Sequence, residues 1–190
     1  MKDMPSTPAK GLVFTKVWKR EDPRDVLILR TAKHLSELRE DAVIATGSKR
    51  RAFQLLKLRP DLQIINIRGN VDTRLRKIEE QQLDGIVLAA AGLKRLGMED
   101  VITQYLAPED MISAPAQGAL ALEVREDQKE LQKMLDVFCD EETMNEVCAE
   151  RNFLEQMGGS CHTPAGARCQ KTAQGYELYA MFGNEDGSKQ

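Results

Sequence analysis

Residues 154–168, LEQMGGSCHTPAGAR, contain the first candidate for chemistry in this chain. A predicted helix ends at two glycines, and Cys161 follows them together with a histidine and a proline. A Gly-Gly turn lets the backbone pass close to a bulky group and leaves the sulfur on a loop rather than in a core. Cys161 is therefore a candidate for carrying a covalent group, and a free cysteine in a tight turn is the simpler alternative.

The other three cysteines have no obvious chemical role. Cys139 and Cys148 fall in predicted helices, where we expect them in the core, and Cys169 falls in a predicted strand. The four cysteines include no C-x-x-C pair, so no zinc site is expected. The N-terminal segment MKDMPSTPAKG lacks the apolar region of a secretory signal, so we expect a cytoplasmic protein with free thiols.

A second candidate is the basic middle of the chain. Residues 41–95 contain eleven Lys and Arg against six Asp and Glu, whereas residues 96–190 contain seven against eighteen. With a net charge of −3 and 5% aromatic residues, this pattern favours a local anion site over a nucleic-acid surface. Solvated cations on helix surfaces are the alternative. No apolar run of about 18 residues exists, so no membrane partner is expected.

Strands and helices alternate where these cations lie. The pattern predicts strands at 42–47, 62–68 and 85–92 and helices at 48–59 and 70–82, which is typical of a parallel sheet with crossover helices. Ligands bind such sheets outside the carboxyl ends of the strands. The residues that follow the strands there are Arg50, Arg51, Arg68, Arg74, Lys94 and Arg95.

The first pair is the most informative. Ser48 is a predicted N-cap, which places Arg50 and Arg51 in the first turn of a helix. Cations there oppose the helix dipole, so their removal should leave stability unchanged or raise it. Their position makes sense if an anion is held between the guanidinium groups and the helix N–H groups.

The chain changes character after residue 100. Residues 115–127 predict a glycine-bearing turn and a strand, and residues 127–138 and 141–157 predict two amphipathic helices. The second helix has an apolar stripe formed by Met144, Val147, Phe153 and Leu154. A hairpin follows around residues 173–175. A strand predicted within the first 25 residues has no visible partner.

Seven segments resemble the porphobilinogen deaminase family and occur in that family's order. They are MKDMPS, REDPRDVL, RRAFQLLKLRPDL, RGNVDTRLRK, LAAAGLKRLG, PAQGALALEVR and AERNFLEQMGGSC. The resemblance covers nearly all the chain. It implies the α/β class with a three-domain architecture: a central parallel-sheet domain resembling periplasmic binding proteins and a small α+β C-terminal domain.

The resemblance also implies domain boundaries. Residues 1–22 would be the tail of domain 1, residues 23–113 domain 2, residues 114–137 the return segment of domain 1, and residues 138–190 an incomplete domain 3. The bulk of domain 1 and the last part of domain 3 would then be absent from this chain.

Members of the family build the linear tetrapyrrole hydroxymethylbilane from four porphobilinogen units, with loss of ammonia. The resemblance implies that Cys161 carries the dipyrromethane cofactor through a thioether and that Asp3, in MKD, is catalytic. A carboxylate beside a pyrrole N–H can stabilise developing positive charge and handle protons. Without the resemblance, Asp3 would be taken for a solvated loop residue. A monomer acting on porphobilinogen is expected.

Each pyrrole carries an acetate and a propionate, and guanidinium groups pair with such carboxylates bidentately. The resemblance assigns this binding to Lys2, Arg20, Arg50, Arg51, Arg68, Arg74 and Arg95. It makes Gln117, in PAQG, a pyrrole contact or part of a hinge.

Three segments depart from the family pattern. ATGSKRR stands where GTSSLRR is usual, PAQG stands where PGQG is usual, and HTP follows the cysteine. None removes a matched charge or the thiol. Two alternatives stay open: a non-catalytic anion-binding module, and a truncated form that binds without turnover.

Overall fold

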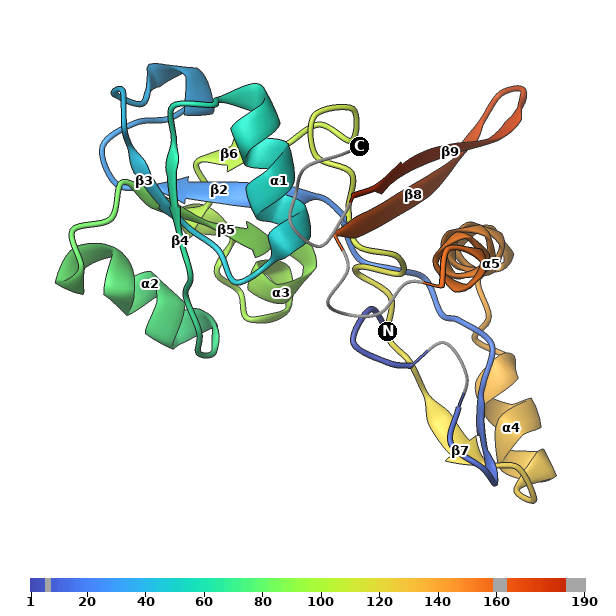
Figure 1. Ribbon diagram of the computed structural model, residues 1–190. Helices are drawn as coiled ribbons and strands as arrows, with labels where there is room; N and C mark the ends of the chain where they lie inside the picture. Colours follow the sequence, from blue (N-terminus) through green and yellow to red (C-terminus); the bar gives the residue numbers. More distant parts are fainter. Residues whose placement is uncertain (6–7, 159–163, 184–190) are drawn as a thin grey trace.

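The computed structural model describes residues 1–5, 8–158 and 164–183 (Figure 1). An α/β body is joined by two chain connectors to a smaller part, which contains a short two-stranded sheet, two helices and a long hairpin. The predicted α/β class is confirmed.

The body is built on a five-stranded sheet with the order β4-β3-β5-β2-β6. Its strands are β2 (Asp25–Leu29), β3 (Val43–Ala45), β4 (Gln63–Ile65), β5 (Gly85–Ala89) and β6 (Gln104–Tyr105). Only β4, β3 and β5 run parallel, as predicted; β2 runs antiparallel to both β5 and β6. The sheet is therefore mixed, because β2 enters from the connector without a crossover helix; the place of β2 in the sheet was not predicted.

Helices cover both faces of this sheet. Helix α1 (Lys49–Leu58) buries Leu55 against Leu27 and Leu29 of β2, while α2 (Val71–Glu80) and α3 (Ala90–Arg95) pack against the other face. Successive residues of β2 alternate between the two clusters, and all five are buried. Burial on both faces explains why this strand reads as a continuous apolar run. The short 3-10 turns η1 (Leu35–Glu37) and η2 (Glu99–Val101) complete the body.

The helix starts follow from side-chain caps. Ser48 Oγ accepts the Arg51 N–H at 3.4 Å, so α1 begins where the sequence predicts, with both arginines in its first turn. Asn70 Oδ1 caps α2 in the same way, accepting the Thr73 N–H at 2.9 Å. Each cap satisfies a helix N–H that has no partner within the helix.

The strand near the N-terminus, β1 (Leu12–Phe14), does have a partner. It pairs antiparallel with β7 (Glu123–Arg125), which lies far along the sequence beyond the whole body. Helix α4 (Lys129–Asp136) follows β7 (Figure 1). Met134, Val137 and Phe138, in α4 and just after it, are largely exposed.

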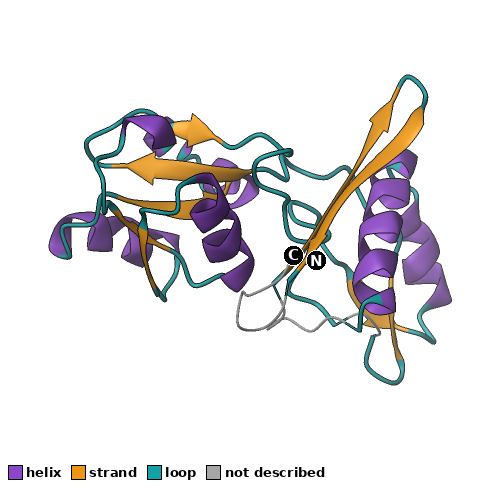
Figure 2. Ribbon diagram, turned by 45° about the horizontal axis from the view of Figure 1, so that its top comes forward, coloured by secondary structure: helices purple, strands orange, loops and turns teal. Residues whose placement is uncertain are grey.

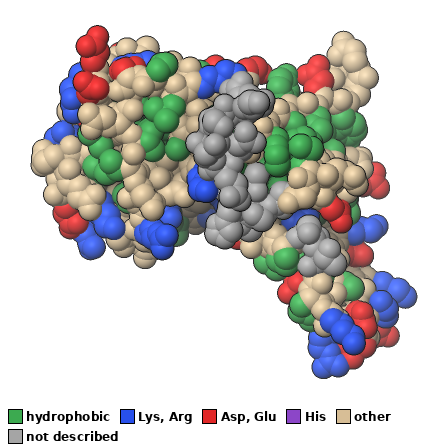
Figure 3. All heavy atoms as spheres, viewed as in Figure 1, with side chains coloured by type: hydrophobic (Ala, Val, Ile, Leu, Met, Phe, Trp, Pro, Cys, Tyr) green, Lys and Arg blue, Asp and Glu red, His purple; other side chains and the backbone are tan. Residues whose placement is uncertain are grey.

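Helix α5 (Glu141–Gln156) packs along the hairpin formed by β8 (Ala165–Thr172) and β9 (Gly175–Phe182), as Figure 2 shows. In Figure 3, hydrophobic side chains gather over this hairpin, where Tyr176 and Leu178 are exposed. Within the described ranges, no helix is long and apolar enough to span a bilayer.

The cysteine expectations are partly wrong. Cys169 lies in a strand, β8, as predicted, and is buried, but Cys148 is exposed on α5. The buried side of α5 carries Val147 and Glu150 instead, which turns Cys148 toward solvent. Cys139 lies between α4 and α5, half-buried, where it forms a β-bridge with Trp18.

Candidate functional site

Two connectors join the body to the rest of the molecule and lie side by side. The first enters β2 and the second leaves β6, and the Glu21 N–H donates to the Gly118 carbonyl oxygen at 3.2 Å. The N-terminus lies at the same place (Figure 1), because the Met1 amino group donates to the Ala119 carbonyl at 2.7 Å. Most of the residues proposed from the sequence meet around these connectors.

Asp25, the first residue of β2, is the centre of this region. Its side chain is fully buried and lies 2.7 Å from Arg51 Nη2 and 2.8 Å from Arg50 Nη2. Arg51 Nε donates to the same Asp25 oxygen at 3.0 Å. The anion that the first turn of α1 was predicted to face is therefore present within the protein itself.

The cluster is not electrically neutral. Burial alone would raise the pKa of Asp25, but the Arg50 and Arg51 charges and the Gln117 hydrogen bond outweigh it and lower that pKa to about 2. Asp25 is thus ionised at neutral pH, and two buried guanidinium groups share its single negative charge. Buried charges are normally paired, so this excess of positive charge can accept a further anion.

Gln117 links this cluster to the N-terminal segment. Its side-chain amide donates to the Pro23 carbonyl at 2.7 Å and to Asp25 Oδ1 at 2.9 Å, while its Oε1 accepts from Lys2 Nζ at 3.1 Å. Burial, followed by the charge of Arg51, lowers the pKa of Lys2 to about 8. Asp3, next along the chain, is exposed and acts on Lys2 electrostatically.

Arg68 follows β4, and Arg74 lies on α2, the next helix along the chain. Arg74 is half-buried, and its Nε donates to the Gly69 carbonyl at 2.8 Å. Burial and the neighbouring Arg51 charge lower the pKa of Arg74. Arg68 is exposed, and its side chain contacts no polar partner in the described part of the chain. These two arginines are available to a ligand in a way that Arg50 is not.

Arg95 and Arg20 instead hold the turn at 115–118. Arg95 Nη2 donates to the Gly118 carbonyl at 2.6 Å, and Arg20 Nη2 donates to the Gln117 carbonyl at 2.6 Å. Arg20 is also paired with Glu150 at 2.9 Å and is almost completely buried. Both side chains already have protein partners.

Several residues at the site were not predicted from the sequence. Glu150 is fully buried on α5 and accepts from the Ala116 N–H at 2.7 Å and the Cys169 N–H at 2.9 Å. Glu146, one turn earlier, lies 3.1 Å from Arg168. Two glutamates four residues apart beside the buried Val147 are the signal that could have indicated a charged buried face.

Gln54, on α1, was also missed. Its side chain bonds both the N–H and the carbonyl of Ile112, at 2.8 and 3.1 Å, so it holds the second connector against the body. Ser113, next in that connector, accepts from the Ala167 N–H of β8 at 3.0 Å. The connector is therefore fixed on both sides.

The PAQG departure has a visible consequence. Ala116 adopts a left-handed conformation with φ +59° and is completely buried, where glycine would be unstrained. Gly118, at φ +86°, cannot be replaced in this way, because a Cβ there would lie 2.2 Å from the Glu21 carbonyl oxygen.

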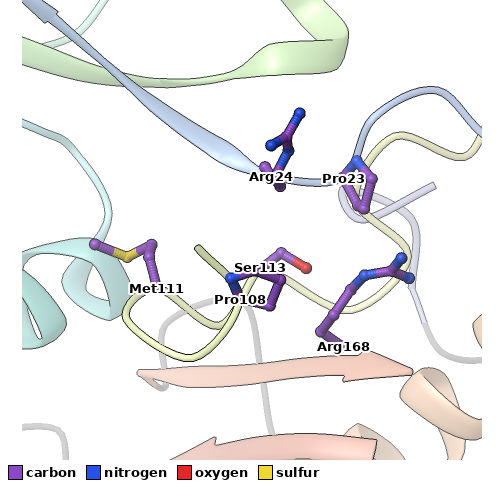
Figure 4. A pocket seen from close by; sticks show the side chains of 6 residues that line it. All are labelled: Pro23, Arg24, Pro108, Met111, Ser113 and Arg168. Carbon is purple, nitrogen blue, oxygen red and sulfur yellow. The ribbon is translucent and has the colours of Figure 1, made fainter. Parts of the chain in front are cut away.

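A small pocket opens beside the connectors (Figure 4). Pro23, Arg24, Pro108, Met111, Ser113 and Arg168 line it. No group of three or more His, Cys, Asp or Glu in the described ranges could hold a metal ion. The predicted cofactor residue, Cys161, lies outside the described residues.

The fold and the site together define an α/β protein with a cationic centre at its connectors. The chain belongs to the porphobilinogen deaminase family. The model described as porphobilinogen deaminase, dipyromethane cofactor binding domain, matches residues 1–133. The model of the porphobilinogen deaminase C-terminal domain matches residues 144–190.

Curated relatives agree with this membership. The porphobilinogen deaminase of Lachnospira eligens is 54% identical over 100% of this chain and 65% of its own length. Those of Clostridioides difficile and Bacillus subtilis are 50% and 48% identical, over 100% and 98% of this chain and 63% and 60% of their own lengths. The chain thus spans less than two thirds of these relatives. Among solved structures, the methionine binding protein MetQ is similar at 15% identity and a TM-score of 0.43, over 74% of this chain and 66% of that one.

Proposed function

We propose that the protein, in its complete form, is a porphobilinogen deaminase that condenses four porphobilinogen units into hydroxymethylbilane with release of ammonia. The observation that carries the proposal is the unbalanced positive charge at the connectors. Arg50 and Arg51 share one carboxylate, and Lys2 and Arg74 add further cations beside them. A pyrrole with an acetate and a propionate supplies the missing anions.

The same charges suit the dipyrromethane cofactor, which bears the same acid groups. We place its attachment at Cys161 and its carboxylates on Lys2, Arg51, Arg68 and Arg74. When bound, the cofactor supplies the free pyrrole carbon to which new units are joined. Arg20, Arg50 and Arg95 serve the site in this proposal by holding the second connector in place, since each donates to one of its backbone carbonyls.

Asp3 is the proposed catalytic group. It is exposed, one residue from Lys2, and so is free to approach a pyrrole N–H held by the cations. Its carboxylate would stabilise the positive charge that develops on the pyrrole and take up or return the N–H proton. Gln117, bonded to both Lys2 and Asp25, keeps the N-terminal segment at the hinge.

The chain spans only part of the length of its curated relatives. This favours a second possibility for residues 1–190 alone, which is that they bind porphobilinogen without converting it. The proposed enzyme is a cytoplasmic monomer, and size-exclusion chromatography tests the oligomeric state.

Intact-mass measurement tests the attachment. After incubation of the completed protein with porphobilinogen, we expect a mass increase of one dipyrromethane. Cys161→Ser should abolish the increase, whereas Cys148→Ser, which alters an exposed thiol on α5, should retain it. An adduct that persists in the Cys161 variant would exclude this attachment site.

Ammonia release tests the chemistry. We expect little or no release by residues 1–190 alone, and release by the chain completed with the segments of the Lachnospira eligens relative that it does not match. Asp3→Asn should lower the rate of the completed protein by about 10²–10³, the usual loss for a preorganised charge. A completed Asp3→Asn protein as fast as its parent would remove Asp3 from the mechanism.

A further inference from the structure

Asp25 has no assigned role in the proposed reaction, yet more of the site depends on it than on any other side chain described above. It begins a strand whose remaining residues are all apolar and buried. A carboxylate in this place costs free energy to bury, and a buried ion pair is often no more stabilising than well-packed apolar side chains. Stability alone is therefore a weak reason for its presence.

The contacts of Asp25 connect three separate segments. It fixes the Nε and Nη2 edge of Arg51 on α1, and its other oxygen lies 2.8 Å from Arg50 Nη2. Two hydrogen bonds in series, through Gln117 on the second connector, link it to Lys2 on the N-terminal segment. Arg51 and Lys2 are far apart in the sequence, and this carboxylate joins their positions.

The orientation of Arg51 also depends on Asp25. With one edge of its guanidinium on Asp25, Arg51 directs Nη1 toward the Val87 carbonyl, at 3.2 Å. Together, the bonds to Asp25 and to Val87 prevent the Arg51 side chain from rotating into the core or into solvent. A guanidinium held in one orientation binds a carboxylate with less loss of entropy than a mobile one.

We propose that Asp25 is a positioning residue that holds Arg51 and, through Gln117, Lys2 in one arrangement for binding the carboxylates of the pyrrole ligand. This inference rests on the proposed function for the identity of the ligand. Asp25 itself is buried and does not touch the ligand.

A competing role predicts the opposite result. If Asp25 were only an internal anion that competes for the arginines, its neutralisation would remove a repulsive charge and tighten the binding of carboxylates. If Asp25 positions the cations, its neutralisation weakens binding although the site becomes more positive. The direction of the change in affinity therefore distinguishes the two roles.

The experiment compares Asp25→Asn, Asp25→Glu and Asp84→Asn. Asp84 is a matched control, because it is also buried and also paired with an arginine, Arg39; it accepts in addition from the Val43 N–H. It precedes β5, whereas Asp25 pairs with Ala89 at the opposite end of that strand.

The first readout is the affinity for porphobilinogen, measured by calorimetry on the completed protein. We expect Asp25→Asn to raise Kd by about tenfold, the effect of weakening one charge-assisted hydrogen bond. Asp25→Glu should recover part of the loss, and Asp84→Asn should change Kd by less than about twofold. A Kd that is unchanged or lower in Asp25→Asn overturns the inference.

The second readout needs no ligand. In NMR titrations with labelled lysine, Asp25→Asn should lower the pKa of Lys2 below its value of about 8, because Asp25 favours the charged amine, and Asp84→Asn should not. An unchanged Lys2 pKa overturns the link between Asp25 and Lys2. Failure of the parent to bind porphobilinogen would instead exclude the proposed function, and this readout would still decide the link.

If Asp25→Asn does not fold, Gln117→Met serves in its place. It breaks the link from Asp25 to Lys2 without removing a charge, and its side chain is of similar size. A raised Kd supports the inference, and an unchanged Kd overturns it.

Discussion

Arg50 and Arg51 show how far a sequence argument can reach at the scale of single residues. Two cations in the first turn of a helix predicted an opposing anion, and the structure places Asp25 there. Because cations in the first turn oppose the helix dipole, removal of either arginine was predicted to leave stability unchanged or raise it. The structure indicates the opposite, because removal would leave a buried carboxylate with only one guanidinium partner.

Arg50→Ala should therefore destabilise the fold, by about 3–5 kcal/mol, which is typical when one member of a buried ion pair is removed. Arg68→Ala is the control, since Arg68 is exposed, and it should change stability by no more than about 0.5 kcal/mol. Urea unfolding followed by circular dichroism measures both. Equal stabilities for the two variants would show that the Asp25 pair contributes nothing to the fold.

Lys2 gives a pH dependence with a definite sign. Its pKa is about 8 in the fold against an ordinary value of 10.5, so the folded protein binds fewer protons than the unfolded chain between these values. The contribution of Lys2 to the free energy of unfolding therefore rises with pH over that window, by ~3 kcal/mol at most, and is constant below pH 8.

The measurement is the difference in unfolding free energy between the parent and Lys2→Met from pH 7 to pH 11. The parent should gain relative to the variant between about pH 8 and pH 10.5. Lys10→Met, which removes an exposed lysine from the same segment, is the control variant. A flat difference for Lys2→Met would mean that the lysine titrates normally.

At the scale of elements, periodicity and caps predicted α1, α2 and α5 to within a residue or two. They failed for β2, because a strand buried on both faces has no alternation and its four apolar residues resemble any apolar run. They also left β1 without a partner. Its pairing with β7 depends on two connectors meeting in space, which no local pattern encodes.

The turn at residues 115–118 allows a specific prediction for the substitution of Gly118. Gly118→Ala should destabilise the protein by more than about 3 kcal/mol, since the added Cβ would overlap the Glu21 carbonyl and φ is +86°. Gly92→Ala is the matched change, because Gly92 lies in α3 and its Cβ would meet nothing within 4 Å. That variant should be stabilised by about 0.5–1 kcal/mol.

Thermal melting of the two glycine variants measures the contrast. A Gly118→Ala protein that melts like its parent would mean that the connectors can separate at this point without cost.

At the scale of the whole molecule, Glu150 joins the C-terminal helix to both the second connector and the hairpin. Glu150→Ala should increase amide hydrogen exchange at Ala116 and Cys169, whose N–H groups it accepts, by at least about tenfold. Glu155→Ala, an exposed change on the same helix, should leave both amides protected. Unchanged protection in the Glu150 variant would show that other contacts hold the three segments together.

The site could be predicted only in part. The strand-end arginines were found from the sheet pattern and Cys161 from its Gly-Gly turn, whereas Asp3, Gln117 and the identity of the group on Cys161 came from family resemblance. Asp25 was not found, because a single aspartate in a charged segment has no periodicity, and only the folded chain places it beside α1. Burial of a charge is a tertiary property, so its signal appears only when the connectors come together.

The side-by-side connectors also determine how the molecule can be divided. Because the chain leaves for β2 and returns from β6 at neighbouring points, the α/β body is topologically an insertion. A segment with adjacent ends can be excised and its ends rejoined by a short Gly-Ser bridge, or circularly permuted within itself. The body can thus be exchanged as a unit between family members. Such an exchange would separate the contribution of the body to ligand specificity from the contribution of the rest of the chain.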